Sequence, residues 1–172
     1  MKLYTIPQGC KSTGVRVSLR SYTPNQEFTF KLTASALYSP ADLNATADSR
    51  EFRSIQKVGG FSLDLFRTVD IRLGYNCTAA DGFFELFSYV DYHRKRWEWK
   101  RLGACRPEKT YTGRITTNPA TNEYRLVVDA VGEIISTLPV DTAYGMGWNL
   151  FPYVEYGDLP AVRDTTIGWQ QL

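Results

Sequence analysis

Apolar and polar residues alternate with a period of two along most of this 172-residue chain, and this pattern restricts its possible folds most strongly. Successive side chains of a β-strand point to opposite faces, so each run predicts a strand with one buried and one wet face. Clear runs are GVRVSLR at 14–20, EFTFKL at 27–32, VDIRLGY at 69–75 and NEYRLVVDA at 122–130. No long window has the 3.6-residue apolar period of an amphipathic helix.

The alternation assigns specific side chains to the core, and turn residues separate the runs. The predicted core residues are Val15, Val17, Leu19, Phe28, Phe30, Leu32, Val69, Ile71, Leu73, Tyr75, Tyr124, Leu126 and Val128. Turns are predicted at Thr23–Asn25, Gly59–Gly60, Ala80–Gly82, Arg106–Pro107, Asn118–Pro119 and Val131–Gly132. About ten short strands without intervening helices predict an antiparallel sandwich or barrel. Residues 35–49 are the least strand-like and are expected to form a long surface loop with one short helical turn.

Length and composition are those of an ordinary globular protein. Residues 1–172 are enough for a single β-sandwich domain, with 43% hydrophobic and 22% charged residues. The net charge of +2 is too small to predict a nucleic-acid or membrane partner. The N-terminal residues lack the apolar segment of a signal peptide, and no apolar run is long enough to span a bilayer, so the expected location is the cytoplasm.

The cysteines do not predict a disulfide framework or a metal site. There are three, Cys10, Cys77 and Cys105, and their spacing is not that of zinc ligands. Three reduced and partly buried thiols are expected, with a Cys77–Cys105 pair left open. No cofactor is predicted.

Residues 83–100, FFELFSYVDYHRKRWEWK, contain the densest group of aromatic and charged side chains. As a strand, 83–92 has one face that suits a core, made of Phe84, Leu86, Ser88, Val90 and Tyr92. The opposite face carries Phe83, Glu85, Phe87, Tyr89 and Asp91. After a turn near 93–96, Trp97 and Trp99 share one face of the next strand.

Mixed aromatic and carboxylate faces are typical of carbohydrate-binding surfaces. Sugar rings stack their C–H faces on flat aromatic rings, while charged groups bind the hydroxyls. The candidate ligand-binding residues are Arg72, Glu85, Tyr89, Asp91, Trp97, Trp99 and Arg125. The alternative is structural: both tryptophans belong to the core, and the two carboxylates are ordinary surface charges.

The sequence favours binding over catalysis, and no catalytic residue is assigned. Glycoside hydrolysis requires two carboxyl groups about 5–10 Å apart. Glu85 and Asp91 are about 20 Å apart along one strand, so they do not form such a pair. A polysaccharide lyase would require a base and a cation, which Tyr89, His93, Arg72 and Arg125 could supply. A lone histidine beside a basic turn is, however, more typical of a surface.

The segment GWNLFPYVEYGDLPAVRDTTIGW at 147–169 resembles the closing segment of bacterial concanavalin A-like β-sandwich proteins. The matching residues are Leu150, Pro152, Tyr153, Gly157, Pro160, Asp164 and Ile167. Val154–Tyr156 replaces a usual Phe-Gly-Gly, and Arg163 replaces a usual histidine. The resemblance implies a two-sheet antiparallel jelly roll, a fold shared by lectins, glucanases, alginate-type lyases and binding modules, and so it does not select one activity.

Pattern and resemblance together predict a non-catalytic, lectin-like protein that binds a polysaccharide or oligosaccharide. The second hypothesis is an assembly module whose aromatic face contacts a protein partner or another copy of the chain. The third is a polysaccharide lyase or glycoside hydrolase.

Overall fold

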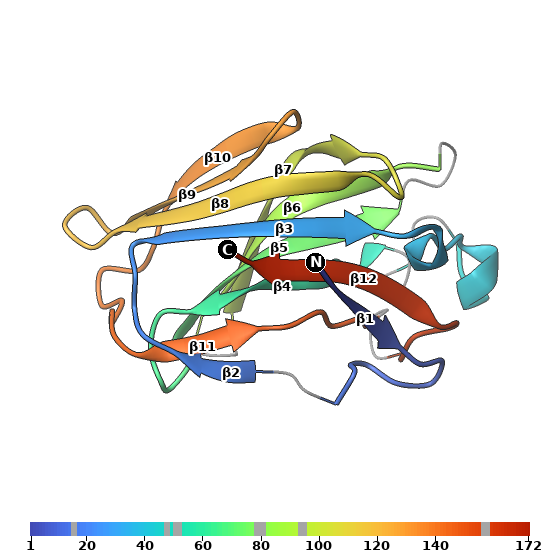
Figure 1. The fold of residues 1–172 in the computed structure, drawn as a ribbon, viewed down its shortest axis with the longest axis horizontal. Coiled ribbons are helices and arrows are strands. Elements are labelled where there is room, and N and C mark those ends of the chain that lie inside the picture. The colour runs from blue at the N-terminus through green and yellow to red at the C-terminus, as the bar shows by residue number, and fades with distance from the viewer. Residues whose placement is uncertain (15–16, 47–48, 50–52, 78–81, 93–95, 156–158) are drawn as a thin grey trace.

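The chain folds into two six-stranded antiparallel sheets packed face to face. The computed structural model describes residues 1–14, 17–46, 49, 53–77, 82–92, 96–155 and 159–172, with the backbone alone for 96 and 97. Sheet A has the order β1-β12-β3-β8-β9-β10, and sheet B has the order β2-β11-β4-β5-β6-β7. Figure 1 looks through sheet A, where β3 and β12 cross in front of β5 and β4. This arrangement confirms the predicted two-sheet antiparallel jelly-roll sandwich.

The strands are short and follow the predicted alternation closely. Sheet A contains β1 (Lys2–Ile6), β3 (Asn25–Leu32), β8 (Thr110–Asn118), β9 (Glu123–Val128), β10 (Gly132–Thr137) and β12 (Thr165–Gln171). Sheet B contains β2 (Val17–Arg20), β4 (Gln56–Ser62), β5 (Val69–Cys77), β6 (Phe84–Tyr92), β7 (Arg96–Cys105) and β11 (Gly147–Leu150). The two strands nearest the C-terminus are interior strands: β12 pairs with β1 and β3, and β11 pairs with β2 and β4.

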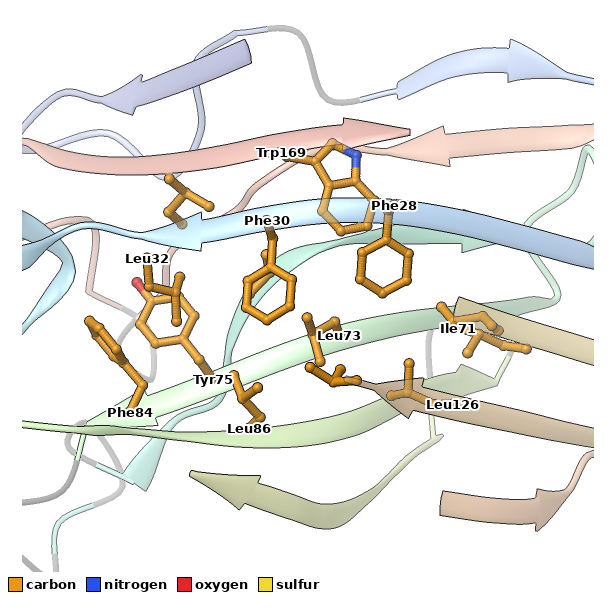
Figure 2. Packing of buried hydrophobic residues seen from close by; sticks show 14 of the residues in the cluster. Phe28, Phe30, Leu32, Ile71, Leu73, Tyr75, Phe84, Leu86, Leu126 and Trp169 are labelled. Atoms are coloured by element: carbon orange, nitrogen blue, oxygen red, sulfur yellow. The ribbon is translucent and has the colours of Figure 1, made fainter. Parts of the chain in front are cut away.

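The core lies between the sheets and is rich in aromatic rings. Figure 2 shows Phe28, Phe30 and Trp169 of sheet A directed toward Leu73 and Leu86 of sheet B. The rings of Phe28 and Trp169 stack with centroids 4.6 Å apart. The predicted core residues of β3, β5 and β9 are all buried, as is the predicted core face of β6. Each fully buried large side chain of this kind contributes about 1.5–3 kcal/mol to folding.

Two local predictions were wrong. Gly59 and Gly60 lie inside β4 and do not form a turn, because the indole of Trp169 needs the space: a Cβ on Gly59 would lie 2.7 Å from it. In β2, Leu19 is 56% exposed, whereas Arg20 points inward over the Phe61 ring at 4.6 Å. The ring gives the inward guanidinium a favourable contact, and the alternation of β2 is therefore opposite to the predicted one.

Residues 34–46 form a connection with two short 3₁₀ turns, η1 (Ala34–Ala36) and η2 (Ala41–Leu43), where one short helical turn was expected. Tyr38 and Leu43 of this connection are buried, so it covers one end of the core rather than lying free on the surface. Among the residues described, no helix is long and apolar enough to cross a bilayer.

The cysteines are free, as expected, and the geometry of the sheet rules out the Cys77–Cys105 disulfide that was left open. Cys77 and Cys105 both pair with Phe84, one from each side of β6. Two strand spacings place their Cα atoms about 9–10 Å apart. A disulfide needs less than about 7 Å, so β6 keeps the two thiols separate.

Candidate functional site: a pocket on the outer face of sheet B

The outer face of sheet B carries a compact group of charged side chains at the centre of the sheet. In the pairing of β5 with β6, Asp70 lies opposite Asp91 and Arg72 lies opposite Tyr89. The same strands send Ile71, Leu73, Ser88 and Val90 into the core. The alternation therefore fixes all four polar side chains on one surface.

Asp70 is the structural centre of this group, with only 1% of its surface exposed. Its carboxylate accepts hydrogen bonds from Arg67, at 3.1 Å from Nε, and from Arg72, at 3.2 Å from the guanidinium. Two cations thus share one buried carboxylate, and the net charge of the three residues is positive. Burial lowers the pKa of Arg72, and the nearby Arg67 also lowers it. The triad therefore holds a fixed guanidinium at the floor of the site.

Lys57 enters the same face from β4. In the register it lies opposite Gly74 of β5, where an added Cβ would lie 2.4 Å from the side chain of Ile55. Its Nζ lies 4.6 Å from the centroid of the Tyr89 ring, a cation–π contact. Burial and the charge of Arg72 lower the pKa of Lys57 from 10.5 to about 8, despite the opposing effect of Glu155 and Asp91.

Tyr89 and Asp91 both hold their protons more tightly than usual. Burial, and then the charge of Asp91, raises the pKa of the Tyr89 hydroxyl to about 12. Burial also raises the pKa of Asp91, with a further contribution from Asp70. The site thus contains a neutral phenol, which donates a hydrogen bond, beside an ammonium group that loses its proton near pH 8.

A pocket of about 260 Å³ is lined on one side by Lys57, Arg67, Arg72, Tyr89 and Asp91. Its other wall is the segment that follows β11, which contributes Phe151, Pro152, Tyr153 and Glu155. Reciprocal backbone hydrogen bonds of 2.8 and 2.9 Å between Tyr153 and Lys57 fix this wall against β4. The backbone N–H of Glu155 donates to Oε1 of Gln56, and its carboxylate pairs with Lys11. The wall is therefore attached to neighbouring elements at Tyr153 and at Glu155.

Beside the pocket lies an exposed aromatic surface. Trp99 of β7 is opposite Tyr89 in the register and is 55% exposed. Its ring stands at 90° to Phe87, with centroids 5.6 Å apart, so the indole is held in place. The structural alternative, in which both tryptophans belong to the core, is wrong for Trp99. The side chain of Trp97 lies outside the described part of the chain, as does His93.

Glu85 and Arg125 are not part of the pocket. Glu85 lies on the same outer face, but near the other end of β6, where it pairs with Arg101 at 2.8 Å. Arg125 lies on β9 of sheet A, is exposed, and forms an ion pair with Glu133 at 2.7 Å. The prediction that Arg125 joins the other candidates was wrong, because alternation alone does not tell which sheet a strand enters. Of the predicted residues, the structure groups Arg72, Tyr89 and Asp91 in the pocket, with Trp99 alongside.

The chemistry of the site is that of polar recognition. Guanidinium, ammonium and carboxylate groups can bind hydroxyls or an acidic group, and an exposed indole can stack on a sugar ring. Within the described residues, no cluster of histidine, cysteine and carboxylate side chains has the arrangement of a metal site.

No family model and no curated protein sequence matches the chain, but solved structures resemble it. An alginate lyase from Pseudomonas aeruginosa superposes with a TM-score of 0.58 at 12% identity, covering 86% of this chain and 63% of that one. A marine PL7 alginate lyase from Zobellia galactanivorans gives 0.55 at 9% identity, covering 89% and 65%. A Bacteroides ovatus GH16 protein from a mixed-linkage glucan utilisation system gives 0.50 at 10% identity, covering 99% and 80%. The chain has the concanavalin A-like jelly-roll fold.

Within this concanavalin A-like fold, the chain spans less than two thirds of the length of the two lyases. The expected fold resemblance is thus confirmed. Sequence reasoning missed Lys57, Arg67 and the wall at Phe151–Glu155. Lys57 lies shortly before the Gly59–Gly60 pair, which interrupts any alternation, and the wall follows a strand end, so neither has a periodic signal.

Proposed function

We propose that the outer face of sheet B binds a carbohydrate and that the pocket around Arg72, Lys57 and Tyr89 is the binding site. The observation that carries this proposal is the convergence of Lys57, Arg72 and Tyr89 from three neighbouring strands, next to the exposed indole of Trp99. The pocket supplies donors and acceptors for hydroxyls, and the indole supplies a flat apolar surface. A sugar ring has both hydroxyl groups and an apolar C–H face, so it can use both kinds of contact.

The alternative in which this face is a protein interface is less well supported. The middle of the surface is occupied by charged groups that line an open pocket, including Lys57, Arg67, Asp91 and Glu155. A flat protein partner would bury Lys57 and Asp91 without supplying new polar contacts to them, at a cost of about 1–3 kcal/mol for each unsatisfied polar group. A hydroxylated ligand that enters the pocket pairs them.

The test is isothermal titration calorimetry with two oligosaccharide series, one from alginate as an acidic probe and one from mixed-linkage glucan as a neutral probe. Tyr89→Ala and Trp99→Ala should each weaken binding at least tenfold, or about 1.4 kcal/mol. Arg125→Ala, on sheet A, is the matched control and should bind like the wild type. Unchanged affinity in both Tyr89→Ala and Trp99→Ala would show that the ligand does not bind to this face.

A second candidate function is β-elimination of an acidic polysaccharide, favoured by the lowered pKa of Lys57. The neutral Lys57 amine would remove the proton next to a uronate carboxylate, and Arg72 would neutralise that carboxylate. Tyr89, which keeps its proton to about pH 12, would donate it to the leaving glycosidic oxygen as the C–O bond breaks. The products are a new hydroxyl end and an unsaturated uronate.

Ultraviolet absorbance of that unsaturated product distinguishes the two functions. Incubation with alginate should generate the absorbance with the wild type and lose it with Lys57→Met and with Tyr89→Phe. Binding without any absorbance change would leave the non-catalytic function alone.

A further inference from the structure

We propose that a second, apolar contact for the same glycan lies on the opposite rim of the pocket, so that the site takes a chain of several sugar rings. This apolar rim consists of Leu19, Leu65, Phe66 and Trp148. The inference rests on the proposed function and adds to it the length of the ligand and a specificity-determining residue, Phe66.

Phe66 is 85% exposed, yet the loop that carries it is firmly held. The buried carboxylate of Asp64 accepts hydrogen bonds from the backbone N–H of Phe66 at 2.7 Å and of Thr68 at 3.1 Å. The hydroxyl of Ser62 donates to the carbonyl of Asp64 at 2.7 Å. Folding therefore fixes a large apolar side chain in water, where burial contributes nothing to stability. A rigidly held, exposed aromatic ring of this kind is expected where the ring contacts a ligand.

The loop leans over the outer face of sheet B. The indole N–H of Trp148 donates to the carbonyl of Leu65 at 2.9 Å, and Trp148 lies opposite Leu19 in the pairing of β11 with β2. Val17, two residues before Leu19 on the same face, lines the pocket. Arg67, the residue after Phe66, also lines it. The rim and the pocket are thus neighbouring parts of one surface.

The spacing of the two aromatic contacts sets the length of the ligand. Trp99 on β7 and Trp148 on β11 are separated by three strands in the order β11-β4-β5-β6-β7. Four strand spacings correspond to about 19 Å. Charged groups of the pocket lie between these two aromatic ends. A glycan chain lying across the strands would place apolar ring faces at both ends and hydroxyls or acidic groups in the middle.

The experiment compares the chain-length dependence of binding in the wild type and in Phe66→Ala, with the same two oligosaccharide series. The wild type should bind hexasaccharides at least tenfold more tightly than disaccharides. Phe66→Ala should lose most of that gain while its disaccharide affinity stays within twofold of the wild type. Phe66→Tyr, which keeps a flat ring, should retain the gain. Val140→Ala is the matched control, since Val140 is 91% exposed but lies by Asn122 of the β8–β9 loop.

The outcomes separate this inference from the proposed function. A hexasaccharide gain that survives in Phe66→Ala overturns the apolar rim while leaving the pocket in place. An equal loss for both chain lengths also overturns it, because Phe66 would then belong to the pocket itself. Sedimentation that shows a wild-type dimer dissociated by Phe66→Ala assigns the rim to a second copy of the chain instead. A wild type that binds neither series overturns the proposed function, and this extension with it.

Discussion

The ammonium group of Lys57 lies 4.6 Å from the centroid of the Tyr89 ring, and Lys57 lies opposite Gly74 in the pairing of β4 with β5. This contact ties β4 to β6 across Gly74 and places a titratable cation in the middle of the candidate site. A Cβ at Gly74 would lie 2.4 Å from the side chain of Ile55, so the close packing of Ile55 on this face requires a glycine there.

The titration of Lys57 predicts a pH dependence of binding. Below about pH 8 the Lys57 amine is protonated in the free protein and attracts an acidic ligand. The negative charge of the bound ligand in turn raises the pKa of Lys57 in the complex above its value in the free protein. Affinity for alginate oligosaccharides should therefore be full below pH 8 and fall about tenfold as the pH rises through the pKa of the complex. Lys57→Arg should remove this fall, since arginine stays charged. Titration calorimetry across pH 6–10 measures it, and the neutral glucan series is the control. A fall of equal size with the neutral series would contradict the role of Lys57.

The buried carboxylate of Asp70 predicts a large stability effect. Asp70→Asn leaves Arg67 and Arg72 without their shared negative charge and should cost about 3–5 kcal/mol of unfolding free energy. Glu133→Gln is the matched control, because it breaks the exposed pair with Arg125 and should cost at most about 1 kcal/mol. Urea unfolding followed by tryptophan fluorescence measures both. Equal effects would mean that the buried triad does not hold the face together.

The close approach of β4 to the Trp169 indole makes Gly59 sensitive to a single methyl group. Gly59→Ala should destabilise the protein by about 1–3 kcal/mol, because the new Cβ would lie 2.7 Å from ring atoms that are packed in the core. At Gly145 no atom lies within 4 Å of a new Cβ, so Gly145→Ala should be close to neutral. Thermal denaturation compares the two. A neutral Gly59→Ala would show that the indole has room to shift.

The cysteines differ in their predicted reactivity. Burial raises the pKa of the Cys77 and Cys105 thiols to about 12, whereas Cys10 is exposed. Because the thiolate is the reacting form, an aromatic disulfide reagent at pH 8 should label Cys10 alone in the native protein. All three should react in denaturant. Cys10→Ser should remove the native labelling, and fast labelling that persists in this variant would mean that a buried thiol opens to solvent.

Much of the fold followed from alternation alone, because a sheet with one dry face requires it. The inward residues of β3, β5, β6 and β9 were predicted correctly from period two. The Gly59–Gly60 pair was misread, since a glycine at a turn and a glycine beneath an indole look the same in sequence. Arg20 was misread because an inward cation over the Phe61 ring depends on a partner far away in the chain.

The candidate site was less predictable, because it is assembled from strands that lie far apart in the sequence. Tyr89 and Asp91 stood out within one aromatic strand, and Arg72 within another. Lys57 becomes recognisable as a site residue only when the pairing of β4 with β5 is known. Tyr153 becomes recognisable as a wall residue only when its backbone hydrogen bonds to Lys57 are known. Arg125 had the right chemistry on the wrong sheet.

The interior positions of β11 and β12, each next to an edge strand, have a consequence for how the chain acquires its structure. During synthesis β1, β2, β3 and β4 emerge early, yet β1 cannot join β3, nor β2 join β4, until the intervening strands arrive from the other end of the chain. Contacts of such long sequence separation slow folding, because the loop entropy is lost before the contacts form. Until then, several strand edges stay open and are prone to pair with other molecules. A nascent chain of this topology therefore depends on its last strands to close both sheets and on protection from aggregation until they appear.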